Sequence, residues 1–219
     1  MKAASEAQRR MILVGAIIGC GIVTAAPPAF AANFSARETS RGLHVDRAGG
    51  AMGKLSSNGW FRRPGEPMFV YREGGKTVAG VWVGSSDAAM VRSGTTESSP
   101  LVGRIVPAWK NGQLWLTIEP AGGAAVQTTV FQRASGGGAL DRHTSTWEAL
   151  QGSYRATLQA GGKDTGWLSV DISPEGGARF SGDLPASIPP ALAAAAAASI
   201  EDEVNYIYGN LSDVNPLMR

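Results

Sequence analysis

Cysteine and histidine are scarce in this sequence of 219 residues, which contains one cysteine and two histidines. The only cysteine, Cys20, lies in a segment that we expect to be removed, so the mature chain has neither disulfides nor thiol chemistry. His44 and His143 are too few for a metal site. Asp141, His143 and Ser145 stand too close together on one loop to converge as a catalytic triad. We therefore expect no catalytic residue, no metal and no cofactor.

A strong charge of either sign is also missing. The chain has 20 Lys and Arg against 18 Asp and Glu, a formal net charge of +2. The expected leader holds three of these basic residues and one acid, so the remainder is close to neutral. Binding of nucleic acid needs a clustered basic surface that neutralises phosphates. We therefore expect no nucleic-acid partner, and no run of like charge indicates a tail for anionic lipid.

The first 31 residues have the pattern of a secretory signal peptide. A positively charged start precedes an apolar run from Met11 to Ala26, and Ala29-Phe30-Ala31 is a cleavage site of the small-residue type. The apolar run is shorter than the ~20 residues that a membrane span needs. We predict a signal peptide over 1–31, a periplasmic or secreted protein, and no stable membrane span after cleavage. An uncleaved anchor and a lipoprotein anchored at Cys20 are the alternatives.

Short runs of alternating apolar and polar residues fill the chain from 55 to 188. The clearest lie in 152–184, which predicts three antiparallel strands joined by turns at Gly161-Gly162 and at 174–177. Lys110-Asn111-Gly112 predicts another hairpin, because Asn-Gly favours the turn that matches strand twist. The sequence therefore predicts a mainly β domain over 55–188. We expect about 8–10 short strands, in an antiparallel meander barrel or a sandwich.

The two flanking segments differ from this domain. Residues 32–54 are polar and glycine-rich, which predicts a loosely ordered N-terminal segment with at most a short strand at 43–45. Residues 189–219 are rich in alanine, the best helix former. We predict one C-terminal helix from about 190 to 208, followed by a tail. A disordered Ala-rich linker is the alternative.

Apolar residues recur at helical spacing in the second half of this expected helix and just after it. They are Ile200, Val204, Ile207 and Leu211, and such spacing indicates one apolar face. We expect this face to lie on the sheet or across a barrel mouth.

Three tryptophans occupy strand positions that call for an explanation. Trp115 and Trp167 alternate with polar neighbours, opposite the aliphatic row of their strands, and Trp82 lies opposite a row of Ala and Val. An exposed aromatic ring on a strand face can bind a sugar, an apolar ligand or a partner. We therefore name Trp82, Trp115 and Trp167 as candidate ligand-binding residues. The alternative is that the rings are covered, inside the barrel or beneath the C-terminal helix.

The motifs near the start of the β domain follow an order that is known from other barrels. They are Gly59-Trp60, then Phe69-Val70-Tyr71, then a Gly-Gly turn and the run 78–84. This order resembles the opening strands of lipocalin-like and avidin-like meander barrels of exported proteins. The resemblance implies a small ligand in the barrel or a protein-binding surface, although a fold does not fix a function.

The function that we expect from these patterns is non-enzymatic. An exported β-barrel protein would bind a small ligand or another component of the bacterial envelope. The alternative is a structural or assembly protein of the envelope that docks through exposed Trp and the C-terminal helix. A hydrolase with scattered carboxylates such as Glu66, Glu119 and Asp171 is a third hypothesis, but their spacing marks no pair for glycoside hydrolysis.

Overall fold

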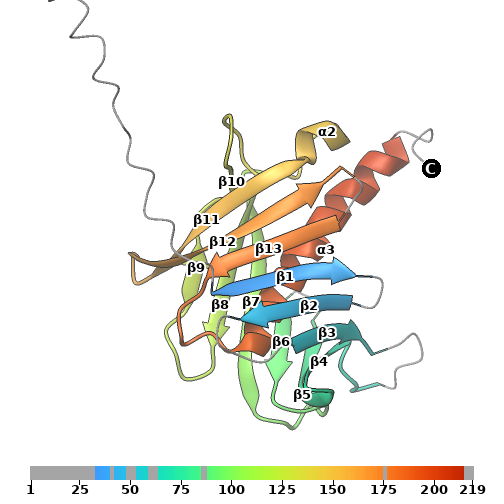
Figure 1. Ribbon diagram of the computed structural model, residues 1–219, viewed down its shortest axis with the longest axis vertical. Helices are drawn as coiled ribbons and strands as arrows, with labels where there is room; N and C mark the ends of the chain where they lie inside the picture. The colour runs from blue at the N-terminus through green and yellow to red at the C-terminus, as the bar shows by residue number, and fades with distance from the viewer. Residues whose placement is uncertain are drawn as a thin grey trace, which may run out of the picture. The chain divides into compact units, whose positions relative to one another are not determined.

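The computed structural model describes residues 33–39, 42–47, 53–58, 64–84, 88–174 and 177–214, the last five of them without side-chain environment. The expected signal peptide at 1–31 lies outside the described residues. Figure 1 labels the elements. They are β1 (Phe34–Thr39), β2 (Gly42–Arg47), β3 (Gly53–Ser57), β4 (Phe69–Glu73), β5 (Lys76–Val83), β6 (Ala89–Arg92), β7 (Leu101–Lys110), β8 (Gln113–Pro120), β9 (Val126–Thr128), β10 (Gln132–Arg133), α2 (Trp147–Leu150), β11 (Gly152–Ala160), β12 (Lys163–Ser173), β13 (Gly177–Asp183) and α3 (Pro190–Val214).

The strands form a closed antiparallel barrel. Strand neighbours follow chain order from β1 to β9 and from β11 to β13, β13 pairs with β1, and β9 pairs with β11. These pairings close a ring of 12 strands. The short β10 pairs with the same edge of β11 as β9 does, but nearer the start of β11. The predicted meander barrel with a C-terminal helix is thus confirmed, and the sandwich is not formed.

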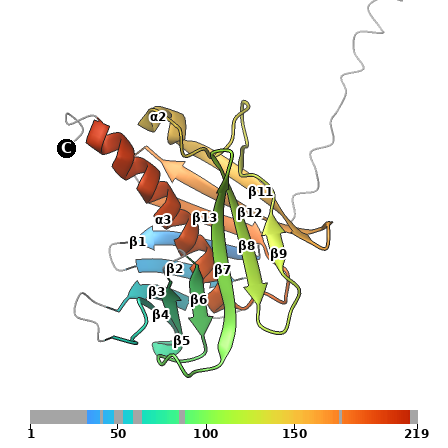
Figure 2. The same cartoon turned by 180° about the vertical axis from the view of Figure 1, so that it is seen from behind.

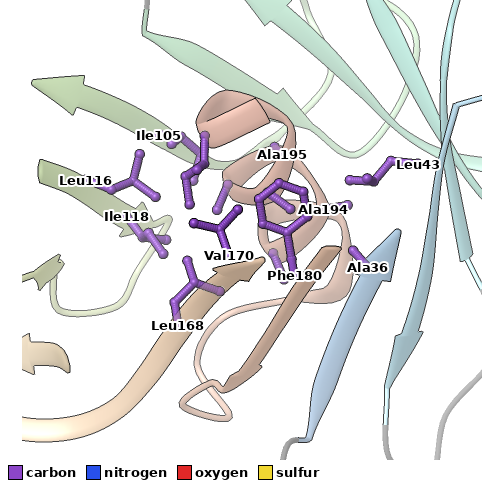
Figure 3. Packing of buried hydrophobic residues seen from close by; sticks show 14 of the residues in the cluster. Ala36, Leu43, Ile105, Leu116, Ile118, Leu168, Val170, Phe180, Ala194 and Ala195 are labelled. Atoms are coloured by element: carbon purple, nitrogen blue, oxygen red, sulfur yellow. The ribbon is translucent and has the colours of Figure 1, made fainter. Parts of the chain in front are cut away.

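The apolar rows predicted from alternation face the inside of the ring. Leu114, Leu116 and Ile118 of β8 are completely buried, while the residues between them are half-buried. In Figure 3, inward side chains of the barrel wall gather around α3, where Ala194 and Ala195 lie among them. The labelled wall residues are Ala36, Leu43, Ile105, Leu116, Ile118, Leu168, Val170 and Phe180.

Helix α3 runs through the barrel instead of lying on it. Every residue from Leu192 to Ala197 is at most 2% exposed. Six consecutive helical residues point in all directions around the axis, and a helix that is buried all round must be enclosed. The helix contacts β1, β2, β3 and β5 to β8. The predicted position, on the sheet or across a mouth, is wrong for the Ala-rich half of the helix.

The alanines and the number of strands explain this arrangement together. An eight-stranded barrel is just wide enough for side chains to fill its interior, whereas 12 strands enclose a wider space that side chains alone leave open. A helix with small side chains is thin enough to fit there. At Gly103 of β7, an added Cβ would come within 2.8 Å of Leu192 Cδ2, so the wall has no spare room at this point.

Hydrogen bonds hold the connection that turns the chain from β13 into the barrel. Asn33 donates from Nδ2 to the Asp183 side chain at 2.8 Å and to the Leu184 carbonyl at 2.9 Å, and its Oδ1 accepts from the Leu184 N–H. Arg47 donates to the Ile188 carbonyl at 3.0 Å. These bonds tie the segment between β13 and α3 to the start of β1 and the end of β2.

The N-terminal segment expected to be loose belongs to the barrel wall. Residues 34–47 contain β1 and β2, and β3 begins at Gly53. Phe34, Ala36, Leu43 and Val45 are buried on the inner face. The segment looks polar in sequence because its other residues face outward, and each strand is too short for a long alternation. These strands also raise the count above the predicted 8–10.

Candidate functional site

A pocket of about 590 Å³ lies between α3 and the barrel wall. It begins where the helix changes from fully buried at Ala195 to exposed at Asp202 and Tyr206. Figure 2 shows the helix running from the region of β6 toward α2. The lining residues are Met68, Phe69, Val81, Val83, Ala89, Pro107, Trp109, Arg142, Ala195, Ala198, Ser199, Asp202, Glu203 and Tyr206.

The two faces of α3 explain why the pocket lies here. Its lining residues on the helix recur at intervals of three and four, so they share one face. Ala195, Ala198 and Ser199 are small and leave space opposite the wall. Val204 and Ile207, with Ile200, form the opposite face and are at most 5% exposed. The apolar face predicted from their spacing therefore packs on one side of the barrel, and the pocket opens on the other.

The wall of the pocket is mostly apolar and comes from four consecutive strands. Phe69 lies on β4, Val81 on β5, Ala89 on β6, and Pro107 and Trp109 on β7. In β7 the inward positions alternate, so Trp109 shares a face with the buried Ile105. The wall offers aliphatic and aromatic surface, and Pro107 has no backbone N–H that could donate a hydrogen bond to a ligand.

Trp109 and Glu203 join the wall to the helix. The Trp109 indole N–H donates to Glu203 Oε2 at 2.6 Å, and both side chains are half-buried. A hydrogen bond to a carboxylate is stronger than one between neutral groups. Trp109 was not predicted as a site residue, because it lies on the inward face of its strand next to the hairpin at 110–112, where a buried aromatic ring is ordinary.

Three of the described lining residues carry a charge. Asp202 and Glu203 come from α3, and Arg142 comes from the loop before α2. The Arg142 backbone N–H donates to the Gly112 carbonyl at 2.9 Å, and the Asp141 side chain accepts from the His143 N–H, so the loop is anchored. An apolar pocket with a few convergent polar groups is typical of small-molecule sites.

A second acidic pair, Glu201 of α3 and Glu38 of β1, lies on another side of the helix. The pKa of Glu201 is raised to about 7. Burial is the main cause, and the charge of Glu38 on β1, a hydrogen bond with Glu38 and the charge of Asp202 add to it. Glu201 does not line the pocket.

The structure places the three candidate tryptophans on the outer side of the barrel, on β5, β8 and β12, which are not neighbours. Trp82 is only 8% exposed, and its indole N–H donates to the Gly65 carbonyl at 3.1 Å. The ring lies so close to Gly80 that an added Cβ there would be 2.7 Å from it. Trp82 is therefore packed against Gly80 of its own strand and bonded to the loop at 64–67.

Cations lie over the other two rings. Lys110 Nζ is 4.8 Å from the centre of the Trp115 ring, and Arg155 Cζ is 4.2 Å from that of Trp167. Both indole nitrogens are buried and lack a hydrogen-bond partner among the described residues. The structure does not bring the three tryptophans together, and α3 covers none of them, because it occupies the interior. Their role in ligand binding stays a prediction.

Neither a metal cluster nor a membrane-crossing helix is found in the described part of the chain. Among those residues, no group of three or more His, Cys, Asp and Glu could hold a metal ion. No helix there is both long and apolar enough to cross a membrane. Comparison of this chain with models of known families, with curated proteins and with solved structures found no match.

Proposed function

We propose that this protein is an exported, non-enzymatic barrel that binds a small, largely apolar molecule in the pocket beside α3. The observation that carries the proposal is the open space of about 590 Å³ between a helix face of small residues and an apolar wall. Burying apolar ligand surface there contributes about 25 cal/mol per Å². Export rests on the pattern of the first 31 residues.

The proposed ligand position differs from the one that the resemblance to lipocalin-like and avidin-like barrels implies. A ligand in those barrels occupies the interior, but α3 fills the interior here. The ligand would instead lie beside the emerging helix, with Trp109 and Glu203 at its side. The proposed site therefore differs from the tryptophan faces named from the sequence.

A second candidate function is docking to another protein of the envelope. Tyr206 is 62% exposed, and Tyr208 stacks edge-on against Trp147 of α2 with ring centres 4.7 Å apart. Exposed aromatic residues are common at protein interfaces. Tyr206 and Tyr208 stand two positions apart and therefore on different sides of the outer part of α3, and this part of the helix is where a partner would bind.

A pocket-filling variant tests the first function. N-phenyl-1-naphthylamine, a neutral apolar dye, is titrated into the processed protein and its fluorescence followed. We expect the dye to bind the wild type, and Ala198→Phe, which fills the pocket, to abolish binding. Val78→Phe adds the same ring at an exposed position outside the pocket and should bind as the wild type does. Absence of wild-type binding, or full binding by Ala198→Phe, would contradict the proposal.

A further inference from the structure

Three aromatic residues from three different elements line the pocket. Phe69 comes from β4, Trp109 from β7 and Tyr206 from α3. Aromatic faces carry negative potential and attract cations, most strongly when the cation is desolvated, and Trp is the best of the three. Aromatic lining alone would also suit a neutral ligand, so the charges beside it decide the ligand class.

Of the three charged residues in the described part of the lining, two are carboxylates. Asp202 and Glu203 follow each other on α3, and the indole N–H of Trp109 fixes the Glu203 carboxylate at the wall. Arg142 is the cation among the described lining residues, whose formal charges sum to −1. Arg142 and Asp202 are both exposed, and Glu203 is half-buried. Solvent and salt screen an exposed charge more than a partly buried one, so the charge of Glu203 is the least screened of the three and the pocket attracts cations.

We propose that the ligand is an organic cation, an amine or quaternary ammonium group on an apolar body. This inference rests on the proposed function, because it names the ligand class for the same pocket. The cationic head lies among Trp109, Tyr206 and the two carboxylates. The apolar body extends between Ala195 and Val81, where the lining is aliphatic. An anionic head in the same place would be desolvated beside two like charges, which is unfavourable.

Three probes with the same decyl chain separate the head groups. They are decyltrimethylammonium, decyldimethylphosphine oxide, which is neutral and of similar size, and decyl sulfate. Isothermal titration calorimetry below the micelle concentration measures their affinities for the processed protein. We expect the ammonium probe to bind about tenfold more tightly than the neutral one, and decyl sulfate to bind most weakly.

Charge-neutralising variants locate the effect. Glu203→Gln keeps an oxygen that can accept the Trp109 N–H but removes the charge, and Asp202→Asn removes the other charge. Each should weaken binding of the ammonium probe several-fold and leave the neutral probe unchanged. Glu148→Gln removes an exposed carboxylate on α2 that does not line the pocket, and it should bind all probes as the wild type does.

The outcomes distinguish the two proposals. If the neutral or anionic probe binds as tightly as the ammonium probe, and Ala198→Phe abolishes that binding, the cation inference fails and the pocket function stands. Equal losses in Glu148→Gln and Glu203→Gln would also overturn the inference, because they would report only overall charge. If no probe binds, both proposals fail.

Discussion

The indole N–H of Trp109 on β7 donates to the Glu203 carboxylate on α3 at 2.6 Å, across 94 residues of sequence. This bond connects the barrel wall to the helix that fills the barrel, at the point where the helix emerges. It therefore contributes both to stability and to the geometry of the pocket.

Removing the indole N–H should weaken the fold. Trp109→Phe leaves an aromatic ring but removes the indole N–H that donates to Glu203. We expect a loss of about 1–2 kcal/mol in the free energy of unfolding, since hydrogen bonds to charged groups are worth about 1.5–3 kcal/mol and this one is partly exposed. Urea denaturation measures it. Trp115→Phe is the matched control, because its indole nitrogen has no partner among the described residues. Equal stability losses in the two variants would contradict the role of the bond.

A side chain added at Gly103 should clash with Leu192 of α3 and destabilise the fold. An added Cβ would meet the Glu119 carbonyl oxygen at 2.6 Å and Leu192 Cδ2 at 2.8 Å. We expect Gly103→Ala to cost about 1–3 kcal/mol, as overpacking of a core does. In Leu192→Ala the added methyl has more room, so the double variant should be less unstable than the sum of the two single changes by at least about 0.5 kcal/mol. Additive effects in chemical denaturation would mean that the two residues are not in contact.

Stability should decrease as the pH rises through neutrality. Burial, helped by Glu38 and Asp202, raises the pKa of Glu201 to about 7 from an ordinary value of 4.5. Between these values the folded protein holds a proton that the unfolded chain has released, so this contribution is complete below the lower pKa and is lost above the higher one. We expect the free energy of unfolding to fall by about 1–2 kcal/mol from roughly pH 5 to pH 8, allowing for solvent screening.

The variant Glu201→Gln isolates this contribution. Urea titrations at several pH values should show a flatter profile for Glu201→Gln than for the wild type, while Glu148→Gln keeps the wild-type slope. Profiles that superimpose for all three proteins would show that Glu201 titrates normally.

Ligand binding in the pocket should not depend on the outer tryptophans. Trp115 and Trp167 lie beneath Lys110 and Arg155 on the outside of the barrel, and neither lines the pocket. We expect Trp115→Ala and Trp167→Ala to bind N-phenyl-1-naphthylamine within about twofold of the wild type, a difference under roughly 0.5 kcal/mol. A loss of tenfold or more in either variant would move the binding site back to the tryptophan faces.

Local sequence signals were sufficient for much of the barrel. The hairpin between β7 and β8 turns at Asn111 and Gly112, whose φ angles of 53° and 79° are those that Asn-Gly tolerates. The meander β11 to β13 follows from alternation and from glycine turns in the same way. Such signals lie within a few residues of each other, so a sequence reveals them without knowledge of the fold.

Long-range relationships could not be predicted in this way. The alanine run predicts a helix, but its enclosure depends on the width of a ring that β1 closes against β13. The pocket depends on Phe69, Trp109 and Tyr206, which meet only because the helix returns through the barrel. The helix was predicted to end near 208, yet α3 continues through Gly209 to Val214, because one glycine in a helix costs only about 1 kcal/mol.

Native-state hydrogen exchange tests the enclosed helix most directly. If α3 runs through the closed barrel, the amides of Ala193 to Ala197 can exchange only when the barrel opens. Their protection should then equal that of Leu116 and Ile118 in β8, at the free energy of global unfolding. Exchange of these alanine amides through a smaller local opening, while β8 stays protected, would show a helix that detaches from the surface and would contradict the account.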